Sequence, residues 1–298
     1  MKGKTVLITG TTSGLGKATA LALAKKGAKI IMVNRPSHKV QQARQEIIKK
    51  SGNQEVASML CDLSSQASIR EFGQAFREQY DSLDVLINNA GALFGERQLT
   101  EDGIERTFAL NHLGYFQVAH YLLDALKKGN APRIVNVSSV THNLNDFDLD
   151  NLQGQKSYSQ IKHYGMTKLC NILFTKFLAQ KMQGIMTVNC LHPGTVGTGF
   201  GKETGSLWMR ICVPIATPFM IRPNKGAETS IYLASSPKVA NITGEYFYKK
   251  KITETTDSAK DMQAAQALWD YSLKLTKIKE FGKANFGQKT KDKGQKTF

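Results

Sequence analysis

The feature that most constrains the fold lies at the start of the chain, where a short apolar strand runs into a glycine-rich turn and then into a helix. The expected strand covers Thr5–Thr9 and the expected helix covers Lys17–Lys26. Glycines let a backbone turn tightly and approach a phosphate, whose charge is stabilised by the free N–H groups and dipole of a helix N-terminus. The turn predicts a nucleotide-binding unit, with candidate phosphate-binding residues Gly10, Thr12, Ser13, Gly14, Leu15 and Gly16.

Beyond this turn, short apolar runs alternate with segments of helical period. The expected strands are Thr5–Thr9, Lys29–Asn34, Val56–Leu60, Val85–Asn88, Arg133–Val137 and Thr187–Leu191. The expected helices are Lys17–Lys26, Lys39–Lys50, Gln66–Tyr80, Tyr115–Lys127 and Ala264–Thr276. Because the strands are apolar at nearly every position, both faces of the sheet should be covered. The predicted fold class is α/β, a single doubly wound parallel sheet of the Rossmann type with helices on both faces.

The chain is expected to form one core domain over residues 1–276. Within it, residues 200–222 are an apolar segment framed by glycines and prolines. Such a segment is a candidate substrate lid, although an ordinary packed helix would show the same apolar side chains. After residue 276 the chain becomes rich in Lys, Gly, Gln and Thr. Residues 277–298 are therefore expected to form a flexible basic tail.

The formal net charge of +16 is concentrated in Lys249–Lys251 and in the tail. Two explanations stay open: a basic tail that promotes solubility, and peripheral contact with an anionic membrane surface. A nucleic-acid partner is not expected, because no basic groove with interleaved aromatic residues is visible.

Cysteine and histidine spacing bears on compartment and metal binding. The four cysteines show no CxxC spacing, and none of the six histidines has a metal-ligand spacing with another. We expect buried, reduced cysteines and no metal. No secretory signal and no apolar run of the roughly 20 residues that span a bilayer is visible, so a cytoplasmic protein is expected, peripheral to a membrane at most.

The end of the second strand bears on cofactor choice. An enzyme that selects NAD usually carries an acidic residue there, which holds the ribose hydroxyls. This chain has Asn34 and Arg35 instead. The planar guanidinium of Arg35, with Lys17 and Lys39 as candidate neighbours, can pair with a 2′-phosphate, so the predicted cofactor is NADP(H).

The sharpest chemical signal is Tyr164 and Lys168, four residues apart and so on the same face of a helix. A phenol has an ordinary pKa near 10, but a neighbouring ammonium stabilises the phenolate and should lower that pKa. The pair could then donate or accept a proton. Upstream, the strand Arg133–Val137 ends in Ser138 and Ser139 at the carboxyl edge of the sheet, where open α/β folds bind ligands.

These motifs resemble the short-chain dehydrogenase/reductase family from Lys4 to about Leu275. The spacing Gly-x-x-x-Gly-x-Gly, the run Asn88-Asn89-Ala90-Gly91 and the Tyr-x-x-x-Lys pair carry the resemblance. It implies further cofactor-binding positions: the adenine-contacting Asp62 with Leu63, the motif residues Asn88, Ala90 and Gly91, the pair Tyr164 and Lys168, and Pro193, Gly194, Val196 and Thr198. His192, beside them, is expected to be structural.

The resemblance also implies a catalytic tetrad of Asn111, Ser139, Tyr164 and Lys168. Tyr164 would exchange the proton on the substrate oxygen, and Ser139, with Ser138 as the fallback, would orient that oxygen. Lys168 would lower the pKa of Tyr164 and hold a nicotinamide-ribose hydroxyl. Asn111 would bend a helix and link a proton relay to solvent through water.

Further stretches, among them the run from Asn111 to Phe116, resemble the branch of retinol dehydrogenases and the WW-domain oxidoreductase. That branch implies hydride transfer to or from an apolar carbonyl or alcohol such as a retinal-like aldehyde. Three alternatives stay open: a steroid or xenobiotic carbonyl reductase, an enzyme like protochlorophyllide reductase, and an idle NADP-binding regulatory protein. The oligomeric state also stays open, because the family commonly pairs through the tyrosine-bearing helix whereas this branch includes monomers.

Overall fold

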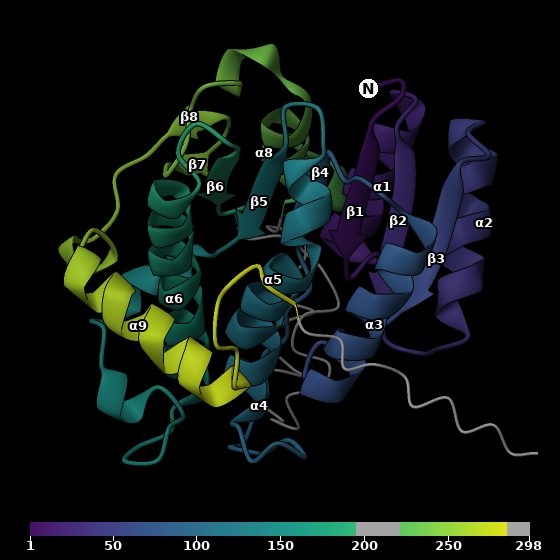
Figure 1. Cartoon of the computed structure of the whole chain (residues 1–298). Coiled ribbons are helices and arrows are strands. Elements are labelled where there is room, and N and C mark those ends of the chain that lie inside the picture. The colour runs from purple at the N-terminus through teal and green to yellow at the C-terminus, as the bar shows by residue number, and fades with distance from the viewer. Residues whose placement is uncertain (195–220, 285–298) are drawn as a thin grey trace, which may run out of the picture.

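The computed structural model describes residues 1–194 and 221–284. In this part of the chain, an eight-stranded sheet has the order β3-β2-β1-β4-β5-β6-β7-β8 (Figure 1). Strands β1 to β7 are parallel to their neighbours, and β8 runs antiparallel to β7. The bounds are β1 Thr5–Thr9, β2 Lys29–Asn34, β3 Val56–Leu60, β4 Val85–Asn88, β5 Arg133–Val137, β6 Thr187–Leu191, β7 Tyr246–Tyr248 and β8 Lys251–Ile252.

The predicted doubly wound sheet is confirmed, and its six predicted strands have the predicted bounds. Their interior residues are almost fully buried: Val6, Leu7 and Ile8 of β1 have no exposed surface. Strands covered on both faces read as continuous apolar runs, which is why they could be located from sequence. The sheet also contains β7 and β8, which were not predicted and which extend it past β6.

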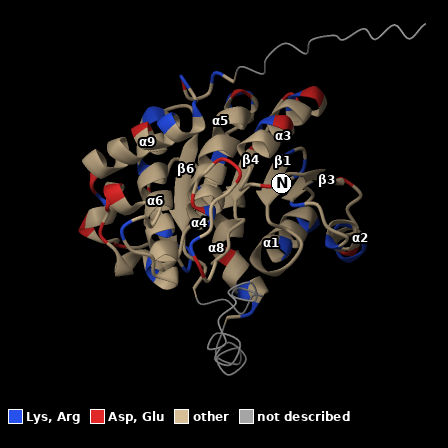
Figure 2. Cartoon of the chain, turned by 90° about the horizontal axis from the view of Figure 1, so that it is seen from below, with Lys and Arg blue, Asp and Glu red and all other residues tan. Residues whose placement is uncertain are grey.

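Helices cover both faces of the sheet. Their bounds are α1 Gly14–Lys25, α2 Lys39–Ser51, α3 Gln66–Gln79, α4 Arg106–Phe108, α5 Gly114–Lys127, α6 Gln160–Lys181, α8 Pro223–Ser235 and α9 Met262–Thr276. One buried apolar core includes residues of α1, α2 and α8, and a second, larger core includes residues of α3, α5, α6 and α9. Figure 2 shows α3 and α5 on one side of the sheet and α1, α2 and α8 on the other.

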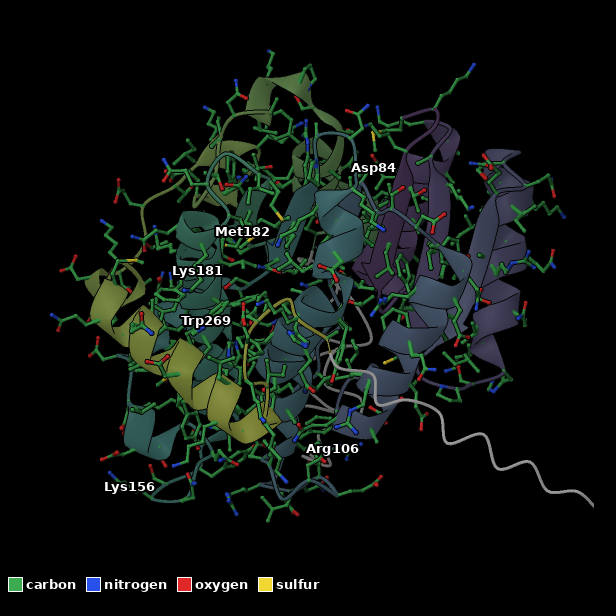
Figure 3. The ribbon with its side chains drawn as sticks, in the orientation of Figure 1. Asp84, Arg106, Lys156, Lys181, Met182 and Trp269 are labelled. Carbon is green, nitrogen blue, oxygen red and sulfur yellow. The ribbon has the colours of Figure 1, made fainter. Side chains whose placement is uncertain are left out.

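Helix α9 closes the second core by packing across α6. The ring of Trp269 lies 5.1 Å from that of Phe177 and 5.1 Å from that of Phe116 in α5. The ammonium of Lys181 lies 5.3 Å from the Trp269 ring, and the two side chains are neighbours in Figure 3. A cation over an aromatic face is attracted by the ring quadrupole. This contact helps to hold α9 against α6, the helix that carries Tyr164.

The packed part of the chain extends past the predicted boundary at residue 276. The ring of Phe281 lies 4.6 Å from that of Trp269 and 4.9 Å from that of Phe116, and Ile278 packs against the same core. The N–H of Gly282 donates to Nδ1 of His120. Residues 277–284 are therefore not a free tail, because two apolar side chains among the lysines reach the core. The rest of the predicted tail, 285–298, lies outside the described residues.

The predicted apolar lid at 200–222 also lies almost wholly outside the described residues, since 195–220 are not described. Among the helices that the structure describes, none is long and apolar enough to cross a membrane.

Candidate active site

The glycine turn after β1 has the tight geometry that the sequence predicted. Gly10 and Gly14 adopt φ angles of +71° and +55°, in the left-handed region that favours glycine. Gly16 faces the start of the same turn so closely that a Cβ there would lie 2.1 Å from the carbonyl oxygen of Gly10. A side chain at this position would push β1 and α1 apart.

The first turn of α1 is open toward a ligand. Ser13, the residue before the helix, makes no side-chain hydrogen bond to it, and Ser13 is exposed while Thr12 is half-buried. Leu15 turns inward and packs with Val137 of β5. The N-terminal N–H groups of α1 receive no cap from Ser13, so phosphate oxygens could accept hydrogen bonds from them. The turn thus fits a pyrophosphate.

Asn89 and Thr9 hold the turn in place, a role that the sequence reasoning missed. The hydroxyl of Thr9 accepts hydrogen bonds from the N–H groups of Asn89 and Ala90, both at 2.9 Å. The Asn89 amide donates to the carbonyl oxygens of Thr9 and Gly10 at 2.8 and 3.1 Å. The loops after β1 and β4 are thereby joined. The second asparagine of the Asn-Asn-Ala-Gly run was the available signal for this contact.

The end of β2 presents a basic side chain and no acid. Asn34 is buried, where its amide oxygen accepts from the N–H of Thr11 at 2.6 Å and its amide nitrogen donates to the Thr11 hydroxyl. Arg35, the next residue, is exposed. Lys17, a candidate neighbour of Arg35, pairs with Glu46 of α2, and this pairing together with Lys50 lowers the pKa of Glu46 to about 2. The residue that follows β2 is therefore basic and exposed, where an NAD-selecting enzyme would carry an acid.

The loop after β3 carries Asp62 and Leu63. One carboxylate oxygen of Asp62 accepts from both the N–H and the hydroxyl of Ser64, at 2.9 and 2.6 Å. Leu63 is buried, and its carbonyl oxygen lies against Gly114 at the start of α5, where a Cβ would come within 2.8 Å of it. The carboxylate of Asp62 is thus held by its own loop at the edge where β3 ends.

Asn88 faces the interior of the sheet. Its amide nitrogen donates to the amide oxygen of Asn136 in β5 at 2.9 Å. The amide nitrogen of Asn136 donates in turn to the hydroxyl of Thr175 in α6, also at 2.9 Å. Asn88 has no exposed surface, so its side chain supports the sheet and the helix above it. Ala90 and Gly91, which follow it, lie half-buried at the carboxyl edge.

The two serines after β5 have different partners, and this distinguishes their roles. Ser138 is buried and donates to the carbonyl oxygen of Lys168 at 2.7 Å. Ser139 instead shares a hydrogen bond with the phenol of Tyr164. Only Ser139 therefore has its hydroxyl beside the tyrosine, in the position that the resemblance assigns to the catalytic serine.

Tyr164 and Lys168 lie together on α6, in a largely dehydrated setting. The ammonium nitrogen of Lys168 lies 5.4 Å from the centre of the Tyr164 ring and donates to the carbonyl oxygen of Val137 at 3.1 Å. Burial lowers the pKa of Lys168 to about 7. Burial also raises the pKa of Tyr164, and the hydrogen bond from Ser139 opposes this only in part.

The expected net lowering of the Tyr164 pKa is therefore wrong for this structure, because the effect of burial is larger and raises it. Both groups are nearly inaccessible to water, 9% exposed for Tyr164 and 2% for Lys168, and low polarity disfavours the charged form of each. The phenol keeps its proton at neutral pH, and the ammonium loses part of its charge. Residue spacing alone could not reveal this, because burial depends on the rest of the fold.

Asn111 lies in a π-helical turn, Ala109–Leu113, between α4 and α5, as the predicted helix bend requires. Its amide oxygen accepts from the N–H of Ala92 and its amide nitrogen donates to the Ala92 carbonyl, both at 2.9 Å. The same nitrogen donates to the hydroxyl of Thr167 at 3.1 Å. A Cβ on Gly91 would lie 3.2 Å from the Asn111 oxygen and 3.3 Å from the Lys168 nitrogen, so the two side chains meet at this glycine.

The segment after β6 borders the same edge. The imidazole of His192 stacks on the ring of Tyr248 at 4.1 Å, and its Nδ1 accepts from the N–H of Gly194. Gly194 has φ +80° and Pro193 is half-buried. Val196 and Thr198, the other two predicted residues of this segment, lie outside the described residues.

The geometry agrees with comparisons to known proteins. The family described as "short chain dehydrogenase" matches residues 4–206. Human retinol dehydrogenase 14 is 40% identical over 288 residues, covering 91% of this chain and 86% of that protein. An uncharacterised protein from Mycobacterium paratuberculosis superposes with a TM-score of 0.75 at 30% identity, covering 93% of this chain and 94% of that one.

A short chain dehydrogenase from Shigella flexneri, complexed with NADP, shares the fold. Its TM-score is 0.66 at 22% identity, covering 83% of this chain and 97% of that one. The chain therefore belongs to the short-chain dehydrogenase family of oxidoreductases, and within it is similar to the retinol dehydrogenases.

Proposed function

We propose that the protein is an NADP(H)-dependent oxidoreductase that transfers a hydride between nicotinamide and a carbonyl or alcohol of an apolar substrate, a retinal-like or other lipophilic aldehyde or ketone. The observation that carries the proposal is the hydrogen bond between Ser139 and Tyr164, with Lys168 one helical turn away. Ser139 lies two residues past the end of β5, and Tyr164 and Lys168 lie on α6. The three side chains meet at the carboxyl edge of the sheet, where open α/β folds bind ligands.

The chain's own residues fit the cofactor. The turn Gly10–Gly16 and the uncapped start of α1 would hold the pyrophosphate, and Arg35 would pair with a 2′-phosphate. Asn34 does not supply the carboxylate that NAD-selecting enzymes place there, because its side chain is a neutral amide, and that amide is bonded to Thr11. The fold neighbour from Shigella flexneri is complexed with NADP, which supports the same choice.

When bound, the nicotinamide supplies or accepts the hydride. Ser139 would donate a hydrogen bond to the substrate oxygen and fix it beside the phenol. Tyr164 would donate its proton to that oxygen during reduction and take it back during oxidation. Lys168 would stabilise the phenolate, and Asn111 would link the relay to solvent. Because burial keeps Tyr164 protonated, the site is prepared for reduction.

Exposed apolar side chains close in sequence to Ser139 and Tyr164 support a lipophilic substrate. Val140 follows Ser139 directly and is 47% exposed, and Ile161, three residues before Tyr164 on α6, is 51% exposed. Leu144, at the end of the same short 3-10 turn as Val140, is also exposed. Exposed apolar side chains that border a site favour an apolar ligand. The retinol dehydrogenase relative points to the same substrate class.

The test is NADPH oxidation at 340 nm with all-trans-retinal, a steroid ketone, an aliphatic aldehyde and a quinone, each repeated with NADH. We expect turnover of retinal or another lipophilic carbonyl with NADPH and at least tenfold slower turnover with NADH. Absence of turnover with every carbonyl, despite tight NADPH binding, would contradict the proposed activity. Equal rates with NADH would contradict the proposed role of Arg35.

A further inference from the structure

Lys168 is a buried cation with few partners. Its side chain is 2% exposed, and its one hydrogen bond in the described part of the chain goes to the carbonyl oxygen of Val137. No carboxylate of the described residues pairs with it. An ammonium needs up to three acceptors or water to offset the loss of hydration. Neutral groups close to the ammonium therefore decide how well the protein tolerates its charged form.

Two aromatic faces lie close to this ammonium. The Lys168 nitrogen is 5.4 Å from the ring centre of Tyr164 and 5.6 Å from the ring centre of Tyr115. Tyr115 comes from α5, so the ammonium lies near a ring from its own helix and a ring from the neighbouring one. Both distances are within the roughly 6 Å over which a ring quadrupole attracts a cation.

The hydroxyl of Tyr115 makes no hydrogen bond that would stabilise this side chain in the core. Tyr115 has no exposed surface, and its hydroxyl has no hydrogen-bond partner among the described residues. A buried hydroxyl without a partner is unfavourable. The ring itself packs in the larger buried core, and its centre lies 5.6 Å from the Lys168 nitrogen.

We propose that Tyr115 is a positioning residue for the reaction, whose ring face keeps the buried ammonium of Lys168 charged and in place beside Tyr164. The groups that face this ammonium are the two phenol rings, the Val137 carbonyl from β5 and, across Gly91, the Asn111 amide. With no carboxylate among them, the aromatic faces carry the stabilisation that a counter-ion would otherwise supply. The catalytic consequence, though not the contact itself, rests on the proposed function.

Removal of the Tyr115 ring should lower the pKa of Lys168. Burial already lowers the pKa of Lys168 to about 7. Without the Tyr115 ring the charged form loses attraction, so the pKa of Lys168 falls further, by roughly half a pH unit to one and a half. A neutral Lys168 stabilises the Tyr164 phenolate less, so alcohol oxidation would require a higher pH.

The experiment follows the 13Cε resonance of Lys168 against pH in lysine-labelled full-length protein, assigned by its absence in Lys168→Met. Tyr115→Phe keeps the ring and should keep the pKa of Lys168. Tyr115→Leu, or Tyr115→Met if the leucine variant does not fold, should lower it. Phe116→Leu is the matched control, because Phe116 is equally buried but packs against Trp269 and Phe174.

An unchanged Lys168 pKa in both Tyr115→Leu and Tyr115→Met would overturn the proposal, as would a fall of equal size in Phe116→Leu. The measurement needs no cofactor or substrate, so it succeeds or fails independently of the proposed activity. Where alcohol oxidation is measurable, the rise of kcat/KM with pH should move to higher pH in Tyr115→Leu and stay in place in Phe116→Leu. A merely structural role would lower the rate without moving the profile.

Discussion

The carboxylate of Glu105 accepts a hydrogen bond at 2.7 Å from Nε2 of His163, the residue that directly precedes Tyr164. Glu105 has no exposed surface and also accepts from the N–H and hydroxyl of Thr107 and from the N–H of Phe108. It thereby caps α4 and ties that turn to the start of α6. The buried carboxylate therefore accepts hydrogen bonds from three residues, His163, Thr107 and Phe108.

Glu105→Gln should lower the free energy of unfolding by about 2 kcal/mol or more, because an amide turns one N–H group toward donors and leaves a buried polar group unpaired. Urea unfolding followed by circular dichroism measures the change. Glu101→Gln, at an exposed position in the same loop, is the control and should change stability by less than about 0.5 kcal/mol. Equal stability of the two variants would mean that the Glu105 contacts contribute little.

The chain end offers a test of the packed boundary. Truncation after Thr276 removes Ile278 and Phe281 from the aromatic cluster around Trp269 and should destabilise the protein by about 2 to 4 kcal/mol. Truncation after Ala284 keeps these contacts and should leave stability within about 0.5 kcal/mol of the full chain. Thermal unfolding of the three proteins measures both. If the shorter chain is as stable as the longer one, the packing of 277–284 is not stabilising.

Arg35 can be tested by charge reversal. Arg35→Glu should weaken NADPH binding by about 10- to 100-fold, the range for losing a charged hydrogen bond to phosphate, and should weaken NADH binding far less. Titration of NADPH fluorescence measures both dissociation constants. Lys25→Glu, an equal charge change at the far end of α1, should leave the ratio of the two constants near its wild-type value. If the ratio of the NADPH and NADH dissociation constants is the same in both variants, the change in net charge explains the weaker binding, and Arg35 does not contact the 2′-phosphate.

Lys168 makes stability depend on pH in a predictable direction. Its pKa is about 7 in the folded chain and near the ordinary 10.5 when unfolded, so between these values the unfolded chain binds more protons. Stability should therefore rise from pH 7 to 10 on account of this group and be constant, at its lowest, below pH 7.

Lys168→Met removes this buried charge and should stabilise the cofactor-free protein at pH 7 by a few kcal/mol, with the gain shrinking toward pH 10. Urea unfolding at pH 7, 8.5 and 10 measures the trend. Lys176→Met, two turns further along α6 at a half-buried position, is the control for the change of side chain. A Lys168→Met protein no more stable than wild type at pH 7 would contradict the low pKa.

The sequence predicted the sheet well because β1 to β6 are buried on both faces, and an apolar run of five or six residues such as Lys29–Asn34 has few alternatives. Strand β7 escaped prediction because Tyr246–Tyr248 is too short to show a pattern and depends on pairing with β6. The end of the packed domain was not predicted correctly for a related reason. Phe281 stands among lysines, and only its contacts with Trp269 reveal that it is buried.

The local geometry of the candidate site was predictable where a motif has a fixed conformation, and was not predictable where the environment decides. The glycine turn and the Tyr164–Lys168 pair are local, and the structure brings Ser139 to the tyrosine as expected. The pKa of Tyr164 and the contact between Tyr115 and Lys168 depend on how α5 packs beside α6. No spacing rule expresses that packing.

The measurement that tests the central claim most directly compares wild type with Tyr164→Phe for NADPH oxidation by a lipophilic carbonyl, alongside NADPH binding by fluorescence. We expect the phenylalanine variant to lose at least about 100-fold in kcat, the contribution of a positioned general acid, while its NADPH dissociation constant stays within about threefold of wild type. A variant that binds NADPH normally and keeps kcat within about threefold of wild type would show that Tyr164 does not supply the proton, and would contradict the mechanism proposed here.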